Sequence, residues 1–180
     1  MSDEKIYRDI EKLRDPKRLA FLETDQVVRF CLEEIAPVTV LDVGTGSGIF
    51  AEAFSRRGLT VTGVDIQEAM LEAARTLVPG TSFQLASSEN LPFADKTFDL
   101  VFLGLVLHES EHPALALQES ARVGNRRIAV LEWPYREENL GPPLKHRIKP
   151  DLLQELSAAS GFPRIKTIPL KYLSLYLLDR

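Results

Sequence analysis

The stretch VLDVGTGSGIF, residues 40–50, places three glycines at alternate positions between two apolar runs. Gly44, Gly46 and Gly48 can adopt positive φ angles and leave the backbone uncovered by side chains. Where such a turn joins a buried strand to the N-terminus of a helix, a ligand can approach the backbone and meet free N–H groups. The stretch therefore predicts a strand, turn and helix with a ligand bound at the turn.

Strand-like and helix-like segments alternate along the chain beyond this turn. The strand segments are rich in β-branched and large apolar residues, which is typical of a parallel sheet covered by helices on both faces. Strands are predicted at residues 38–43, 59–65, 81–87, 98–105, 126–133, 164–168 and 171–178, and helices at 47–58, 67–77, 112–123 and 150–161. The last two strands are joined by too short a link for a parallel crossover, so they are expected to be antiparallel.

The pattern predicts an α/β fold with a three-layer α/β/α doubly wound seven-stranded sheet, mostly parallel, with an antiparallel C-terminal strand hairpin. A chain of 180 residues fits one domain. Residues 1–36 are expected to form helices broken at Pro16, and residues 134–149 a proline-rich loop. Basic pairs at element boundaries, such as Arg126 and Arg127, are expected to be solvated.

The composition favours a small-molecule or protein partner over nucleic acid or a membrane. The net charge is -4, and acidic and basic residues are interspersed, so no basic footprint for nucleic acid stands out. No apolar run approaches the roughly 18 residues of a membrane span. Cys31 is the only cysteine, and residues 1–20 lack the apolar core of a secretory leader. We therefore expect a cytoplasmic protein.

Acidic residues around the glycine turn indicate which ligand it accepts. Asp65 ends the second predicted strand, 21 residues after Gly44, where a carboxylate can accept hydrogen bonds from both hydroxyl groups of a ribose. A dinucleotide-binding turn would have glycine at the sixth position counted from Gly44, which is Ile49 here. Asp42 would repel phosphates and attract an ammonium group. A nucleoside that carries an amino-acid moiety is therefore favoured over a pyrophosphate.

Four stretches, VLDVGTGSG, VTGVDIQEAML, SENLPFADKTFDLVFLGLVLHE and ESARV, resemble the successive motifs of class I S-adenosylmethionine-dependent methyltransferases in order and spacing. The resemblance covers residues 38 to about 133 and implies S-adenosylmethionine as cofactor. It implies N-terminal helices at 1–36, a cofactor-binding core at 37–133, and an acceptor-side loop, helix and strand pair at 134–180. The chain departs from the family at Ser87, where many relatives carry an aspartate that accepts a hydrogen bond from the adenine amino group.

The resemblance also implies where the cofactor would lie. The methionine end would contact the glycine turn, the ribose would bind Asp65, adenine would lie against Ile66, and its edge would meet Ser88 and Glu89. The implied cofactor-binding residues are Asp42, Gly44, Thr45, Gly46, Gly48, Asp65, Ile66, Ser88, Glu89 and Gly104, the last of these on the methionine side.

Methyl transfer by direct displacement needs few catalytic side chains, because the cofactor is already activated and the protein mainly aligns the reactants. A base is needed only where the acceptor loses a proton. His108, just past the fourth predicted strand, is the candidate catalytic residue, and Glu132, Tyr135 and His146 are further candidates. The alternative for His108 is a loop histidine that packs or caps.

The stretch HESEH, residues 108–112, matches the zinc-binding pattern H-E-x-x-H. The residues before it read as a buried strand and its exit, and Pro113 suits the first turn of the next helix. One helix is therefore not expected to carry both His108 and His112, and no metal is predicted.

The favoured function is methyl transfer from S-adenosylmethionine to a small-molecule acceptor, with carbon, nitrogen, oxygen and sulfur acceptors all open. The alternatives are a methyltransferase-like domain that holds the cofactor without catalysis, and a nucleotide-dependent oxidoreductase. Little of the chain lies outside the cofactor core, so a second subunit of a homodimer is a candidate to complete the acceptor pocket.

Overall fold

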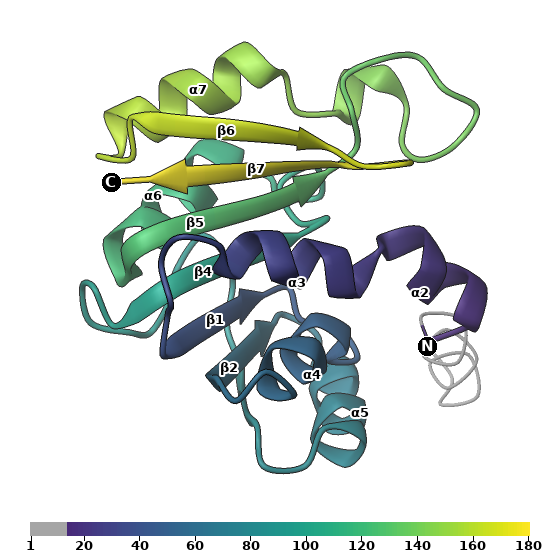
Figure 1. The fold of residues 1–180 in the computed structure, drawn as a ribbon, viewed down its shortest axis with the longest axis vertical. Coiled ribbons are helices and arrows are strands. Elements are labelled where there is room, and N and C mark those ends of the chain that lie inside the picture. Colours follow the sequence, from purple (N-terminus) through teal and green to yellow (C-terminus); the bar gives the residue numbers. More distant parts are fainter. Residues whose placement is uncertain (1–13) are drawn as a thin grey trace.

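A computed structural model describes residues 14–180, which contain a seven-stranded sheet in the order β3-β2-β1-β4-β5-β7-β6 (Figure 1). The strands are β1 (Thr39–Val43), β2 (Thr60–Asp65), β3 (Ser82–Leu85), β4 (Phe98–Gly104), β5 (Gly124–Glu132), β6 (Arg164–Pro169) and β7 (Ser174–Asp179). Strands β1 to β5 pair in parallel, and β7 runs antiparallel to both β5 and β6. The predicted fold class is confirmed.

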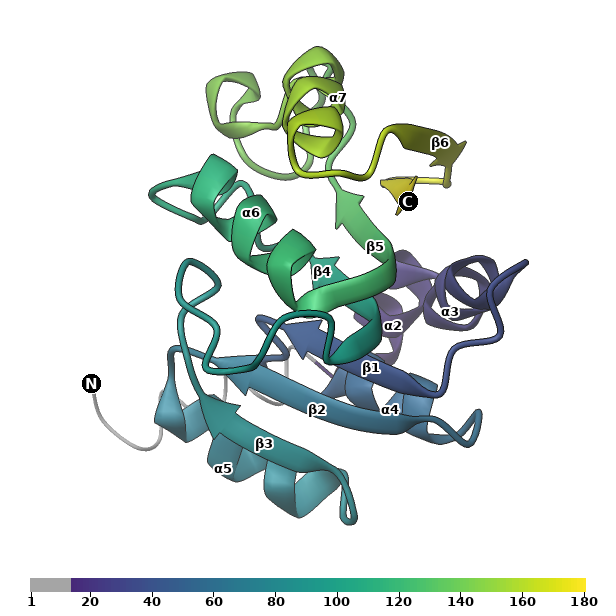
Figure 2. The same ribbon diagram turned by 90° about the vertical axis from the view of Figure 1, so that its left-hand side faces the viewer.

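Helices cover both faces of the sheet (Figure 2). On one side lie α3 (Thr24–Leu32), which follows α2 (Pro16–Leu22), together with α4 (Ile49–Ser55) and α5 (Glu68–Leu77). On the other side lie α6 (Pro113–Val123) and α7 (Pro150–Ala159), and a short 3-10 helix, η1 (Leu144–His146), precedes α7. None of the described helices is long and apolar enough to cross a membrane.

The strands separate two cores because successive side chains point to opposite faces. In β1, Val40 packs with Val28 of α3 and Phe54 of α4. Its neighbour Leu41 packs with Leu117 of α6 in the other core. Burial on both faces explains why the strands are almost continuously apolar, as the sequence indicated.

The structure corrects the expectation for Arg127, and it describes only part of the predicted N-terminal helices. Arg127 was expected to be solvated, but its side chain is only 2% exposed and binds the Asp179 carboxylate at 2.6 Å and the carbonyl of Glu33 at 2.7 Å. A buried arginine is stable here because its donors find acceptors. Pro16 begins α2 at its first position, and any helix before it lies outside the described residues.

Candidate active site

The glycine turn closes over the carboxyl end of β1 and is tied to β2. Gly44 and Gly46 have φ angles of 66° and 53°, in the left-handed region that favours glycine. The N–H of Thr45 donates to the carbonyl of Val64 at 2.9 Å, and the N–H of Gly46 donates to Oδ2 of Asp65 at 2.8 Å. The turn is therefore shaped by its contacts with β2, and Asp65 lies beside it.

Gly44 and Gly48 serve different purposes. A Cβ atom on Gly44 would lie 2.3 Å from Cγ2 of Val106, so this position has no room for a side chain. A Cβ atom on Gly48 would lie 3.0 Å from Val78 and 3.3 Å from Ala74, at the end of α5. Gly48 lines neither of the two cavities described below. Its place in the structure corresponds to helix packing, and its cofactor contact stays a prediction.

Asp42 lies beneath the turn and is buried. Its Oδ2 accepts a hydrogen bond from the Thr45 hydroxyl at 2.6 Å. Burial raises the pKa of Asp42 to about 7, against the opposing effects of the hydrogen bonds from Thr45 and the backbone of Ala51. Asp42 lines neither cavity, and its side chain supports the turn from below. The ligand contact that the sequence pattern suggests for Asp42 stays a prediction.

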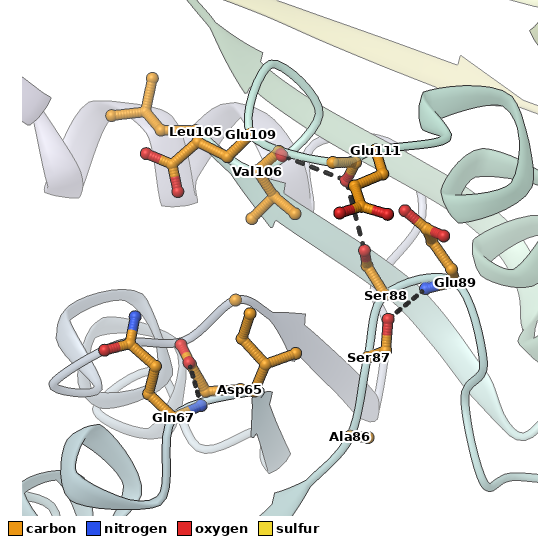
Figure 3. Close-up of a pocket in the computed structure, with 13 residues that line it drawn as sticks. Asp65, Gln67, Ala86, Ser87, Ser88, Glu89, Leu105, Val106, Glu109 and Glu111 are labelled. Atoms are coloured by element: carbon orange, nitrogen blue, oxygen red, sulfur yellow. Dashed lines mark hydrogen bonds between the residues drawn. The ribbon is translucent and has the colours of Figure 1, made fainter.

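A first cavity of about 380 Å³ lies beyond the carboxyl ends of β2 and β3 (Figure 3). Ile66 is 69% exposed and offers an apolar surface on one wall. Ser87, Ser88 and Glu89 line the same cavity. The Ser87 hydroxyl accepts the Glu89 N–H at 3.2 Å, so the residue that departs from the family pattern organises this wall locally. The cavity brings together the residues predicted to surround adenine.

A second cavity of about 550 Å³ continues from the first. Both are lined by Gly44, Asp65, Leu105 and Glu109. The second also contains Thr45, Gly46, Gly104 and His108, as well as apolar side chains from distant parts of the chain: Leu22, Phe50, Trp133 and Pro142. The volumes of both cavities lie in the range of small-molecule sites. The predicted site residues therefore line one continuous site, with the exceptions of Asp42 and Gly48.

His108 is joined to the buried Glu132 at the end of β5. Its Nδ1 lies 2.8 Å from Oε2 and 3.1 Å from Oε1 of Glu132. Burial alone would lower the pKa of His108, but the hydrogen bond and charge of Glu132 outweigh it, so the pKa is raised. The other candidates, Tyr135 and His146, do not line either cavity. His112 precedes α6, and no metal-binding cluster of three residues occurs within residues 14–180.

The sequence did not single out the residues of α2 that line the second cavity. Arg18 and Leu22 line it, and the buried hydroxyl of Ser47, in the same cavity, has no hydrogen-bond partner among the residues that the structure describes. In the sequence, Arg18 is visible only as a cation on a predicted helix that leads toward the core. Charged residues are so common on surface helices that this does not mark Arg18 as a site residue.

The loop between β5 and α7 is organised by Arg147, whose side chain is 1% exposed. Its guanidinium donates to four backbone carbonyls at 2.6–2.9 Å, and it lies 5.6 Å from the ring centroid of Trp133. The four carbonyls belong to Pro134, Arg136, Leu140 and Pro142. Trp133 and Pro142 are thereby fixed where they line the second cavity.

Comparison with known proteins agrees with this geometry. A family model described as a methyltransferase domain matches residues 41–127. An uncharacterized methyltransferase of Mycobacterium tuberculosis is 37% identical over 105 residues, covering 57% of this chain and 42% of that protein. Demethylmenaquinone methyltransferase of Thermotoga maritima is 33% identical over 111 residues, covering 59% of this chain and 48% of that protein. The match thus spans less than half of the length of either relative.

The crystal structure of a SAM dependent methyltransferase from Aquifex aeolicus has the same fold over nearly its whole length. It superposes with a TM-score of 0.80 at 27% sequence identity, covering 95% of this chain and 96% of that chain. With the strand order and the glycine turn already described, these matches support a class I S-adenosylmethionine-dependent methyltransferase.

Proposed function

We propose that this chain binds S-adenosylmethionine along the two joined cavities and transfers its methyl group to a small-molecule acceptor in the second. The observation that carries the proposal is the continuity of the cavities around Gly44 and Asp65. An apolar wall at Ile66 faces one end, and His108 faces the other. The name of the Thermotoga maritima relative, which describes a methyltransferase acting on demethylmenaquinone, supports a small-molecule acceptor.

The residues present fit the nucleoside end of the cofactor. The Asp65 carboxylate accepts the N–H of Gly46 at 2.8 Å and that of Gln67 at 2.9 Å, one on each oxygen. These contacts fix the carboxylate, and each oxygen retains acceptor capacity for a ribose hydroxyl. The side chain of Ile66 gives adenine an apolar surface, while Ser88 and Glu89 offer polar atoms at the opposite wall.

The second cavity fits the amino-acid end. Arg18 supplies a cation that can pair with the methionine carboxylate. The buried Ser47 hydroxyl, without a partner among residues 14–180, supplies another polar group. The first turn of α4 adds backbone N–H groups that favour an anion. Gly44 lines both cavities and offers a ligand its backbone without a side chain.

Bound S-adenosylmethionine supplies a methyl group already activated by its sulfonium sulfur. The chain's own contribution is to hold the acceptor in line and to exclude water. Leu22, Phe50 and Trp133 form an apolar lining suited to both tasks. His108 lies in the same cavity, where it can receive a proton if the acceptor must lose one.

The proposal is tested by calorimetry with S-adenosylhomocysteine and with NAD, and by transfer of a tritiated methyl group. Binding of S-adenosylhomocysteine without NAD binding is expected. Binding of NAD alone would favour an oxidoreductase. Cofactor binding without methyl transfer to any acceptor would favour a non-catalytic domain.

The Asp65→Ala variant tests the ribose contact directly. We expect it to weaken S-adenosylhomocysteine binding by about 1–3 kcal/mol, the scale of a lost charge-assisted hydrogen bond. Glu72→Ala, at an exposed position on α5 outside both cavities, is the matched control and should bind like the wild type. An unchanged affinity in Asp65→Ala would reject the ribose assignment.

A further inference from the structure

We propose, building on the proposed function, that His108 and Glu132 act together as a fixed general base and that the acceptor is a hydroxylated aromatic compound methylated on oxygen. His108 would be the catalytic residue, and Glu132 a positioning residue that acts through it. The inference comes from the hydrogen bonds around Glu132 and from the lining of the second cavity.

Hydrogen-bond donors surround both oxygens of Glu132, so its carboxylate acts only as an acceptor toward the His108 ring. The backbone N–H groups of His108 and Trp133 each donate to one of its oxygens at 3.2 Å. With backbone donors on both oxygens and Nδ1 of His108 at 2.8 Å, the group fits an ionised carboxylate whose third donor is Nδ1–H. The neutral imidazole therefore carries its lone pair on Nε2.

Nε2 is the nitrogen that remains for chemistry. His108 lines the second cavity, and its side chain is 10% exposed, so the ring is shielded but reachable from that cavity. Oε1 of Glu109 lies 3.7 Å from Nε2 and belongs to a side chain that is 77% exposed. Arg147, on the loop side, lowers the pKa of His108 and so opposes the effect of Glu132 and Glu109. Tyr176 of β7 lies near Glu132.

The rest of the cavity indicates the class of acceptor. Beside its polar residues, Leu22, Phe50, Leu105, Trp133 and Pro142 give it apolar and aromatic walls, which suit a flat aromatic ring. A neutral amine or a thioether can attack a methyl group without first losing a proton. A phenol-type hydroxyl, which has a pKa of about 10 in tyrosine, is mostly protonated at neutral pH and benefits from a base.

The step balances within the residues and molecules named. Nε2 of His108 takes the proton of the acceptor hydroxyl as its oxygen attacks the methyl carbon. The bond between that carbon and the sulfonium sulfur breaks, and its electron pair stays on sulfur. The products are a methyl ether, S-adenosylhomocysteine and an imidazolium whose charge Glu132 stabilises.

The first experiment compares tritiated methyl transfer to 1-naphthol and to 1-naphthylamine, with S-adenosylhomocysteine binding measured in parallel. We expect naphthol to be methylated at least tenfold faster. His108→Gln should lower that rate by about 100-fold or more, within the range for loss of a general base, while S-adenosylhomocysteine affinity stays within about twofold. Glu137→Gln, an exposed position in the β5–α7 loop, is the matched control.

The pH dependence of the methyl-transfer rate tests whether Glu132 acts through His108, because a merely structural role of Glu132 would not shift its midpoint. The base must be unprotonated, so the rate should rise with pH through the raised pKa of His108. Glu132→Gln removes the negative charge, so the midpoint should move to lower pH while the maximal rate falls by about tenfold. A fall in rate without any shift in midpoint would overturn the positioning role.

Failure of this inference is separable from failure of the proposed function. If S-adenosylhomocysteine does not bind, the proposed function is wrong. If it binds but naphthol is not methylated, or naphthylamine is preferred, the acceptor class is wrong. If His108→Gln retains the wild-type rate on naphthol, the base assignment is wrong.

Discussion

The two cavities of the site are built by different means. The first is made from the carboxyl ends of neighbouring strands and the turns that follow them, so short segments at one edge of the sheet shape it. The second takes its walls from α2, the end of β5 and the loop that Arg147 fixes. The cofactor end thus depends on local backbone geometry, whereas the acceptor end depends on side chains that meet across long stretches of chain.

Because of this difference, the two halves of the site should tolerate different amino-acid substitutions. A turn shaped by backbone hydrogen bonds changes little when surface side chains change, because its donors and acceptors are in the main chain. A wall held by one arginine depends on that residue. The acceptor half is therefore the part where single substitutions should alter the site without abolishing cofactor binding.

Removing Arg147 should break the acceptor half alone. In Arg147→Met, four carbonyls lose a buried charged donor, and we expect a loss of about 3–5 kcal/mol in the free energy of unfolding. S-adenosylhomocysteine affinity should change by less than about threefold, or roughly 0.7 kcal/mol. Urea denaturation and calorimetry measure the two. Arg136→Met, an exposed arginine of the same loop, is the control, and a loss of cofactor binding equal to the loss of stability would contradict the division.

Asp42→Asn tests whether the buried carboxyl group of Asp42 supports the turn from below. Because the folded-state pKa of Asp42 is raised from 3.8 to about 7, the stability it contributes is present below pH 3.8 and is lost as pH rises toward 7. At pH 8 the variant should be more stable relative to wild type than it is at pH 4, by about 2–4 kcal/mol. The raised pKa of His108 affects the wild type and the variant equally, so the difference in their stabilities reports on Asp42. Parallel stability curves from pH 4 to 8 would refute this expectation.

Gly44→Ala and Gly46→Ala form a matched pair within the turn. Both positions have positive φ, but only at Gly44 would the new methyl group meet another side chain, that of Val106. We expect losses of about 2 kcal/mol for Gly44→Ala and about 1 kcal/mol for Gly46→Ala in thermal unfolding. Adding Val106→Ala should recover part of the first loss and none of the second. Equal losses without recovery would show that strain alone, not the contact, limits Gly44.

Arg18→Met should give the smallest effect, because Arg18 is half-buried and solvent screens its charge. S-adenosylhomocysteine binding is expected to weaken by about 1 kcal/mol, or about fivefold, if Arg18 pairs with the methionine carboxylate. Lys17→Met, an exposed neighbour on α2, should leave calorimetric affinity unchanged. The same loss in both variants would instead indicate a general effect of charge.

The sequence predicts the sheet well because its signals are local. Buried parallel strands require continuous apolar runs, and the left-handed turn requires glycine at Gly44 and Gly46. Strand ends then place Asp65 and His108 at the same edge of the sheet. These residues could be assigned to one site before any coordinates were known.

The remaining parts depend on contacts that a motif does not contain. A motif shows that Asp42 and Gly48 flank the turn, but not that Asp42 lies beneath it and that Gly48 faces a helix. Arg18 reaches the second cavity only because α2 packs across the carboxyl edge. Arg127 is buried because acceptors from a distant helix end and from β7 surround its guanidinium.

The contact between Gly44 and Val106 links the two halves mechanically. Val106 lies two residues before His108, and its methyl group occupies the space that a side chain on Gly44 would need. A displacement of the turn would therefore push directly on the segment that carries the imidazole. In the proposed site, the spacing between the glycine turn and the His108 segment would therefore be set by one methyl group and one missing side chain. The distal loop could then change in sequence without disturbing that spacing.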